Sequence, residues 1–300
     1  MAIESKSVPF TILNAFTDDI AGGNPAAIVF ISSLSAYSDE VLLTIARNFN
    51  QPITTFVSPG PVPTTSDAEI AEFGARWFTP DVEVPMCGHG SLAAAKAIFT
   101  HGSLVPASVN TLRFESDKGR VAVARRAEDD RIEIALDAAS LTELSNEDDA
   151  TKLRAALERA VGKDVKVKFM GRGDAKYPQY VLVELDVLDL GALKVDPQAL
   201  LDSPFGVHVL TASPTTGPPD VAFHSRMFAP AAGIPEDQVC GTAHCLLAPY
   251  WKAKKQLSGA IIAKQVSSRG GDLRVVVDEV EELVRLAGHV KVVSKGELFL

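Results

Sequence analysis

The first third of the chain alternates between short apolar runs and polar turns. Between the first two runs lies the sequence Gly22-Gly23-Asn24-Pro25, which is typical of a tight, specifically shaped turn. Ser38 is a favourable N-cap, and apolar residues follow it at helical spacing. This part of the pattern predicts strands at 8–13, 26–31, 53–57 and 73–78, a helix at 39–49, and a buried helix of small apolar residues at 91–99.

The remaining two thirds contain more strand patterns than helix patterns. A charged amphipathic stretch predicts one helix at 147–161, and a second helix is predicted at 243–254. Together with the first third, this pattern predicts an α+β protein rich in strands. The strands predicted here are 111–114, 120–124, 131–136, 165–170, 180–185 and 221–228, with three more near Ile261, Val275 and Val290.

Composition excludes several classes of protein. The 300 residues are 46% hydrophobic and 22% charged, which is typical of a globular protein of two domains or one large one. A net charge of −9 argues against nucleic acid or an anionic membrane as the main partner. The chain has three cysteines, no apolar run long enough to span a membrane and no signal-peptide pattern at residues 1–6, so we expect a cytoplasmic protein.

An internal repeat carries the chemical information. Residues 76–80 and 226–230 both read Arg-x-Phe-x-Pro, and each is followed by a loop, a Cys-Gly pair and a run of small residues. Matching positions lie 150 to 153 residues apart, from 226 − 76 and 240 − 87, which is half the chain. This spacing indicates a duplicated domain with Cys87 and Cys240 in equivalent places.

Each of these cysteines would lie just before the N-terminus of a helix. The unpaired amides there carry partial positive charge, which lowers the pKa of a thiol and binds a carboxylate. The pattern therefore predicts an isomerase in which one thiolate takes a proton from one face of an α-carbon and the other thiol returns a proton to the opposite face. A purely structural role is the common fate of a buried cysteine, and we expect it for Cys245, which has no counterpart in the repeat.

No cofactor or metal is predicted. The chain has no Walker motif and no Gly-x-Gly-x-x-Gly after a strand. A zinc site built from Cys87, His89, His244 and Cys245 is not favoured, because no Cys-x-x-Cys or His-x-x-x-His pair is present.

Motifs spread over nearly the whole chain resemble the phenazine-biosynthesis (PhzF-like) isomerase family, which has the diaminopimelate epimerase-like fold. The motifs are 16–18 with 23–26, 54–56, 76–83 with 88–89, 236–237 with 241–244, 248–251 and 269–271. The resemblance implies two pseudo-symmetric domains, each a curved sheet or barrel around a central helix, with the site in the cleft between them. It also implies that the final strand completes the first domain, and a homodimer is common in the family. With a boundary near residue 120, we expect residues 1–120 and 289–300 in the first domain and 121–288 in the second.

At one position the chain departs from that family. The family usually has a catalytic glutamate where this chain has Ile53, which cannot transfer a proton. Residues 86–91 are instead similar to the corresponding motif of proline racemases, and 240–242 to their second motif. Diaminopimelate epimerases also have a cysteine before glycine at both sites. The resemblance therefore implies a PhzF-like scaffold with the acid/base pair of a two-thiol racemase.

Roles follow for the residues around the two cysteines. His89 is expected to hydrogen-bond the substrate or donate a proton, and Asp237 to bind a substrate ammonium group or orient the second motif. Arg76 and Arg226 are expected to be structural. The predicted catalytic residues are Cys87 and Cys240, and the predicted binders of a small-molecule carboxylate are Asn24, Gly88, His89, Gly90, Ser91, Asp237, Gly241 and Thr242.

Two other functions remain open at this point. One is a double-bond or keto–enol isomerase of a secondary metabolite, as the PhzF-like scaffold implies, with Asp237 and His89 transferring the protons. The other is a binding protein without catalytic activity that has lost its glutamate.

Overall fold

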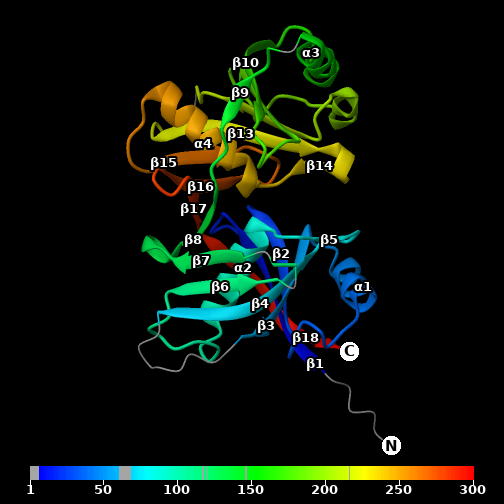
Figure 1. Ribbon diagram of the computed structural model, residues 1–300, viewed down its shortest axis with the longest axis vertical. Helices are drawn as coiled ribbons and strands as arrows, with labels where there is room; N and C mark the ends of the chain where they lie inside the picture. The colour runs from blue at the N-terminus through cyan, green and yellow to red at the C-terminus, as the bar shows by residue number, and fades with distance from the viewer. Residues whose placement is uncertain (1–6, 61–68, 117, 120, 146, 216) are drawn as a thin grey trace, which may run out of the picture. The chain divides into compact units, whose positions relative to one another are not determined.

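The computed structural model describes residues 7–60, 69–116, 118–119, 121–145, 147–215 and 217–300. The chain forms two compact units: Met1–Ala135 with Ala287–Leu300, and Leu136–Leu286 (Figure 1). The division after Ala135 lies further along the chain than the 120/121 boundary considered above. The reason is that β7 (Val121–Arg126) and β8 (Ile132–Asp137) continue an antiparallel pairing that begins with β6 (Thr111–Glu115).

The first unit is one curved sheet. Its strands follow the order β18-β1-β2-β3-β4-β6-β7-β8, and only the pairs β2–β3 and β4–β6 are parallel. A short strand, β5, turns back against the end of β4. The bounds not yet given are β1 Ser7–Ala15, β2 Asn24–Phe30, β3 Ile53–Pro59, β4 Ile70–Phe78, β5 Glu83–Val84 and β18 Val290–Phe299.

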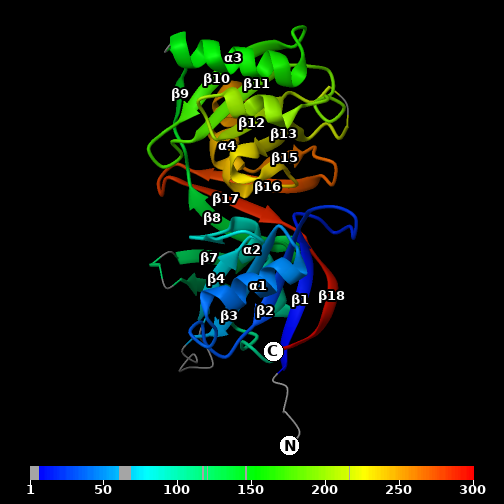
Figure 2. The same ribbon diagram turned by 90° about the vertical axis from the view of Figure 1, so that its right-hand side faces the viewer.

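A central helix, α2 (Gly88–Thr100), is enclosed by this sheet (Figure 2). It contacts strands from both ends of the strand order, among them β18, β1, β2, β3 and β7, and every residue from Gly88 to Ile98 is buried. On the other face of the sheet, α1 (Asp39–Phe49) packs its apolar side against Val29, Phe56 and Phe78. Ser38 caps α1 as predicted, since its hydroxyl accepts a hydrogen bond from the Val41 amide at 3.4 Å.

The second unit repeats this plan. Its strands follow the order β9-β10-β11-β12-β13-β15-β16, again with two parallel pairs, β11–β12 and β13–β15. The buried helix α4 (Gly241–Lys255) connects β13 to β15, as α2 connects β4 to β6, and α3 (Glu147–Val161) packs on the outer face. The bounds are β9 Leu141–Glu143, β10 Lys166–Gly173, β11 Tyr180–Asp186, β12 Val207–Ala212, β13 Val221–Ala229, β14 Ile234–Asp237, β15 Ile261–Gln265, β16 Gly271–Asp278 and β17 Leu283–Gly288.

The predicted fold class is confirmed: the protein is α+β, with two similar halves built on curved sheets and central helices. Most predicted elements lie in place, although residue 120 lies outside the described residues. Helix α2 begins at Gly88 instead of residue 91, because enclosure by the sheet outweighs the poor helix propensity of two glycines. Strands β12 and β17 and the short strands β5, β9 and β14 have no counterpart in the sequence prediction.

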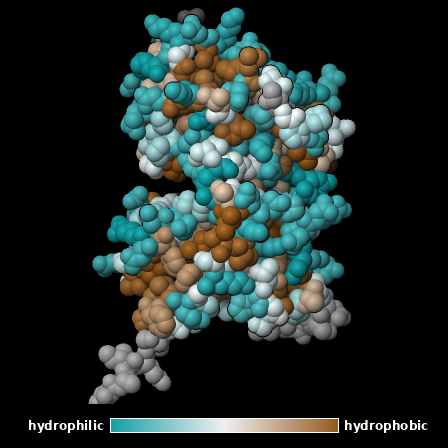
Figure 3. Space-filling view, turned by 180° about the vertical axis from the view of Figure 1, so that it is seen from behind, coloured by the Kyte–Doolittle hydropathy of each residue, from teal (hydrophilic) through white to brown (hydrophobic). Residues whose placement is uncertain are grey.

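Apolar side chains reach the surface of both units (Figure 3), among them Val280, which is 94% exposed, and Leu188, which is 82% exposed. Such residues are normal on protein surfaces. Among the described residues, none of the helices has the length and apolar character required to cross a membrane.

Helix α2 packs closely against the sheet at Gly90. A Cβ at this position would lie 2.8 Å from the Thr55 hydroxyl and 3.2 Å from both Ile53 and Trp77. We expect Gly90→Ala to destabilise the protein by about 1–2 kcal/mol despite the better helix propensity of alanine, because the core is overpacked.

Chemical denaturation of this variant alone and in a Trp77→Met background is the measurement. Methionine is the residue that the second unit has at the equivalent position, 227, where helix α4 carries Ala243. We expect the alanine to cost less stability in that background, because one of the three close contacts is removed. Equal losses in both backgrounds would show that Trp77 is not the obstacle.

Three histidines are buried in the two units: His89 in α2, His208 in β12 and His244 in α4. Burial lowers the pKa of each from 6.5 to about 4. Between those values the unfolded chain binds protons that the folded protein does not, so the free energy of unfolding falls as pH falls from 6.5 towards 4.

We expect His208→Leu to flatten this pH dependence, measured as denaturation midpoints across that range. Leu210→Met in the same strand changes the core without removing a titratable group, so it should shift all midpoints equally. An unchanged slope in His208→Leu would contradict the assignment.

Candidate active site

Cys87 is the N-cap of α2. Its backbone is extended, with φ −135° and ψ 120°, and its side chain makes no capping bond to the helix. The thiol thus lies at the first turn of the helix, where the amides of Gly88, His89 and Gly90 have no acceptor within the helix. Partial positive charge and amide donors thus lie directly beside the sulfur.

In the first unit His89 contacts this thiol, and Asn24 contacts His89. Nδ1 of His89 lies 3.3 Å from the Cys87 sulfur and 3.5 Å from the Asn24 amide nitrogen. Nδ1 is the ring nitrogen that faces both side chains, whereas Nε2 is buried. Burial lowers the pKa of His89 to about 4, although a hydrogen bond to the Pro25 backbone acts in the opposite direction. His89 is therefore a neutral imidazole beside the thiol at neutral pH.

Ile53 lies under the same helix turn. It is 2% exposed, and its side chain packs against Gly90 in the inner layer of the sheet. Its neighbour Thr55 is also fully buried and faces Gly90. This wall below the first turn of α2 is mainly apolar and has no group that can transfer a proton in the place where the family usually has glutamate.

Cys240 occupies the equivalent place in the second unit. It is the N-cap of α4 in an extended conformation, and its side chain is 5% exposed. Its sulfur lies 3.1 Å from the Thr242 hydroxyl, which in turn lies 2.9 Å from the Tyr180 hydroxyl. The Cys240 amide donates to Oε1 of Gln265 at 2.9 Å.

The pKa of Cys240 differs from the sequence expectation. The helix N-terminus was expected to lower it, but burial raises it well above its ordinary value, and the negative charge of Asp237 adds to the effect. Hydrogen bonds from Thr242 and from the Ala243 amide oppose the shift without reversing it. Cys240 is therefore a protonated thiol at neutral pH.

Asp237 lies at the end of β14, where its side chain accepts a hydrogen bond from the Val239 amide at 3.1 Å. It pairs with Met227 in the same register in which Val84 pairs with Trp77 in the first unit. The two thiols thus have different neighbours: a neutral histidine near Cys87, and a carboxylate near Cys240.

The backbone carbonyls of the two cysteines also have side-chain hydrogen-bond partners at equivalent positions of the repeat. The Ser91 hydroxyl donates to the Cys87 carbonyl at 2.8 Å, and Nδ1 of His244 lies 2.8 Å from the Cys240 carbonyl. Both partners stand four residues after their cysteine, and both thiol partners, His89 and Thr242, stand two residues after it.

Each predicted site residue therefore lies around the N-terminus of a buried helix. The first unit brings together Asn24, Gly88, His89, Gly90 and Ser91 with Cys87, and the second brings together Asp237, Gly241 and Thr242 with Cys240. Sequence reasoning missed Tyr180 and Gln265, which come from strands distant in sequence. No motif marks them, because only the pairing of those strands with their neighbours places them at α4.

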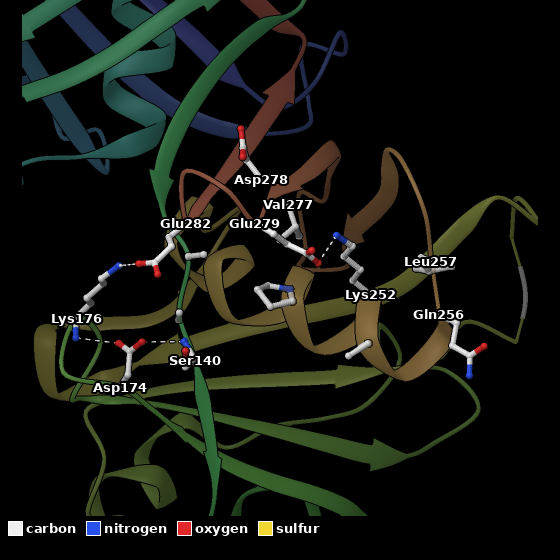
Figure 4. A pocket seen from close by; sticks show the side chains of 14 residues that line it. Ser140, Asp174, Lys176, Lys252, Gln256, Leu257, Val277, Asp278, Glu279 and Glu282 are labelled. Atoms are coloured by element: carbon white, nitrogen blue, oxygen red, sulfur yellow. Dashed lines mark hydrogen bonds and ion pairs between the residues drawn. The ribbon is translucent and has the colours of Figure 1, made fainter.

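A cavity of about 700 Å³ lies elsewhere in the second unit, at the C-terminal half of α4 (Figure 4). Two of its lysines pair with glutamates of the same lining: Lys252 with Glu279 at 2.7 Å and Lys176 with Glu282 at 3.7 Å. It contains none of the predicted site residues. In the part of the chain that the structure describes, no three His, Cys, Asp or Glu side chains gather as a metal site would require.

Comparison with known proteins agrees with this arrangement. A family model described as phenazine biosynthesis-like protein (PhzC-PhzF) matches residues 13–296. A protein of Pseudomonas aeruginosa named an uncharacterized isomerase is 33% identical over 291 residues, covering 97% of this chain and 98% of its own length.

Solved structures give the same result. The crystal structure of a PhzF-family phenazine biosynthesis protein from Enterococcus faecalis superposes with a TM-score of 0.81 at 28% identity, covering 98% of this chain and 100% of its own. A probable proline racemase from Agrobacterium radiobacter, with a TM-score of 0.60 and 11% identity over 98% of this chain and 93% of its own, shares the fold. Over nearly its whole length, the chain belongs to the phenazine biosynthesis-like family of isomerases.

Proposed function

We propose that the protein is a cofactor-independent racemase or epimerase that transfers a proton at the α-carbon of an amino acid or a related carboxylate. The observation that carries the proposal is the repeated site: each unit has a cysteine as the N-cap of a buried helix, with a partner for its sulfur two residues later. The mechanism requires both thiols to reach one substrate carbon from opposite faces.

The helix N-termini would supply the binding energy and stabilise the charge. A substrate carboxylate would accept hydrogen bonds from the first-turn amides of α2 and α4. Removal of the α-proton places negative charge on the carboxylate oxygens, and those amides would stabilise it without rearranging. Glycine after each cysteine leaves room for the carboxylate to approach the backbone.

The unequal neighbours assign the two roles in the proposed direction. Cys240 keeps its proton because of burial and the Asp237 charge, so it would act as the acid. Cys87, as a thiolate at the positive end of α2, would take the α-proton and become a thiol, while Cys240 gives its proton to the opposite face and becomes a thiolate. Proton exchange with solvent would then restore the starting state. The reverse reaction uses the same two groups in exchanged roles.

A second candidate is a double-bond or keto–enol isomerase of a secondary metabolite. It is supported by the family match over residues 13–296 and by the apolar Ile53 wall, which suits a larger apolar substrate. In this case His89 and Asp237 would transfer the protons, and the cysteines would only bind. The partner in either case would be a small-molecule carboxylate, and a homodimer fits the proposal equally well.

The first test is exchange of the substrate α-hydrogen in deuterated water, followed by NMR over a panel of amino acids and 2-substituted acids. We expect exchange with at least one substrate, and a loss of about 10²–10⁴-fold in racemisation for Cys87→Ser and for Cys240→Ser. Cys245→Ser is the control, since Cys245 is fully buried one turn into α4.

Two outcomes would contradict the thiol mechanism. Full activity in Cys240→Ser combined with its loss in His89→Asn would favour the second candidate. The absence of exchange across the whole panel would leave a binding role.

The charge of Asp237 gives a pH prediction. Because the Asp237 carboxylate raises the pKa of Cys240, Asp237→Asn should lower that pKa and increase the thiolate fraction at alkaline pH. Thiolate absorbance during a pH titration in a Cys87→Ser/Cys245→Ser background measures this directly.

The alkaline limb of the rate–pH profile should move to lower pH in the same variant, because Cys240 loses the proton that it has to donate. Asp202→Asn, which removes a surface carboxylate paired with Arg159, is the control. An unchanged titration of Cys240 would show that Asp237 does not act on the thiol.

A further inference from the structure

An arginine and a glutamate form the same pair in both units, outside the candidate site. Nε and Nη2 of Arg76 donate to the two carboxylate oxygens of Glu83, both at 2.9 Å. Nε and Nη2 of Arg226 donate to the two oxygens of Glu236 at 2.7 and 2.9 Å. Each pair is thus a two-point contact made through the same edge of the guanidinium group.

Both arginines also stack on the phenylalanine of their own motif. The guanidinium carbon of Arg76 lies 5.1 Å from the centre of the Phe78 ring, and that of Arg226 lies 5.1 Å from Phe228. Phe78 and Phe228 belong to the outer apolar layers that α1 and α3 cover. The Arg-x-Phe motif therefore seats each arginine on a rigid apolar base.

Each arginine is anchored to a further part of its unit. Nη2 of Arg76 donates to Asp39 in the first turn of α1 at 2.7 Å. Nη1 of Arg226 donates to the carbonyls of Leu190 and Leu193, at 3.3 and 2.5 Å. The arginines are only 5% and 9% exposed, so breaking either pair would remove the two-point carboxylate partner of a largely buried charge.

The spacing along the chain shows what these pairs hold. Glu83 and Glu236 each stand four residues before their cysteine, whereas Arg76 lies seven residues before its glutamate and Arg226 lies ten before its own. The loop between arginine and glutamate thus differs in length by three residues, while the distance from glutamate to cysteine is the same. The part of the repeat that keeps its length is therefore the segment from the paired glutamate to the cysteine.

We propose that Arg76–Glu83 and Arg226–Glu236 are positioning clamps, which fix the segment before each cysteine so that its sulfur is held beside the first turn of its helix. The four residues are positioning residues, since each acts through the cysteine and none of them is assigned a contact with the substrate. The role of these clamps in catalysis rests on the proposed function, but the experiment that tests the clamps does not require it.

The geometry explains how a clamp on the outer face controls a thiol on the inner side. Successive residues of a strand point to opposite faces of the sheet, so Arg76 faces outward while its neighbour Trp77 packs under α2. Strands β5 and β14 carry the glutamates and pair with the ends of β4 and β13. The glutamate is fixed by its arginine, and the cysteine is fixed by the helix that it precedes. Because three residues separate the glutamate from the cysteine, the thiol cannot move far.

The test measures the reactivity of each thiol separately. Glu83→Gln and Glu236→Gln keep the size of the side chain and remove its charge. Each variant is treated with methyl methanethiosulfonate over a range of pH, and the labelling rates of Cys87 and Cys240 are followed by mass spectrometry, with the buried Cys245 as an internal reference. No substrate is needed, so the result is independent of whether the protein is a racemase.

We expect each variant to change the labelling rate of its own cysteine by roughly tenfold or more and that of the other cysteine by less than about twofold, because a hydrogen bond to a charged group is lost in one unit only. For Cys240, which is buried, the rate should rise. Arg76→Lys and Arg226→Lys should behave like the glutamine variants, since lysine keeps the charge but not the two-point contact.

The controls are Glu133→Gln and Glu281→Gln, which remove carboxylates paired with Arg125 in the first unit and Arg285 in the second. They should leave both thiols unchanged. Where a substrate is available, the clamp variants should lower kcat by about 10–100-fold with little change in KM, because a small misplacement of the thiol affects the reaction more than binding.

Several results would overturn the proposal. One is a loss of thermal stability in the clamp variants with both labelling profiles unchanged, which would show a structural role alone. Another is an equal change at both cysteines, which would show general loosening of the fold. If Glu83→Gln does not fold, the lysine variant of Arg76 provides the same comparison. If the labelling rates change as expected but the protein shows no isomerase activity, the clamp proposal is supported and the proposed function is wrong.

Discussion

Both halves of the protein depend on enclosing a helix with a buried, mainly apolar N-terminal half within a single curved sheet. Helix α2 has no side that tolerates water, since all its residues from Gly88 to Ile98 are buried. A sheet that curls around such a helix must approach it closely, and the contacts at Gly90 show that one glycine is needed where Trp77 and Ile53 meet the first turn. The same enclosure leaves the helix amides at the N-terminus as the polar end of an apolar interior.

The cysteine that precedes each helix N-terminus has its burial and its neighbouring groups determined by how the sheet encloses the helix. At Cys240 burial is nearly complete, and it outweighs the helix dipole in setting the pKa of the thiol. At Cys87 the neighbour is the neutral His89, which also contacts Asn24, and the register position that Asp237 occupies in the second unit is held by Val84. A duplicated scaffold has thus acquired two thiols of different character, which is what a reaction with one acid and one base requires in the proposed mechanism.

The two faces of each sheet have different roles, and both roles affect the segment that contains the Cys-Gly pair. The inner face holds the helix, while the outer face is covered by α1 in the first unit and by α3 in the second. Arg76 and Arg226 lie in the outer layer, yet the glutamates that they bind lead directly into the cysteines. The apolar layer that stabilises each unit can thereby also fix the position of the proposed catalytic group, although the two are on opposite sides of the sheet.

Features that depend on local residue patterns or on the internal repeat, such as two of the helices and the two cysteine positions, were predictable from the sequence alone. Apolar spacing predicted α1 and α3 over nearly the observed ranges, and the Arg-x-Phe-x-Pro and Cys-Gly repeat placed Cys87 and Cys240 before two buried helices. The early start of α2, the short strands β5 and β14 and the contacts of Tyr180 and Gln265 were decided only by tertiary structure, because they arise from strands pairing across long stretches of chain. The pKa of Cys240 belongs to the same group: the sequence gives its helix position, but the burial that raises the pKa exists only once the sheet has closed around α4.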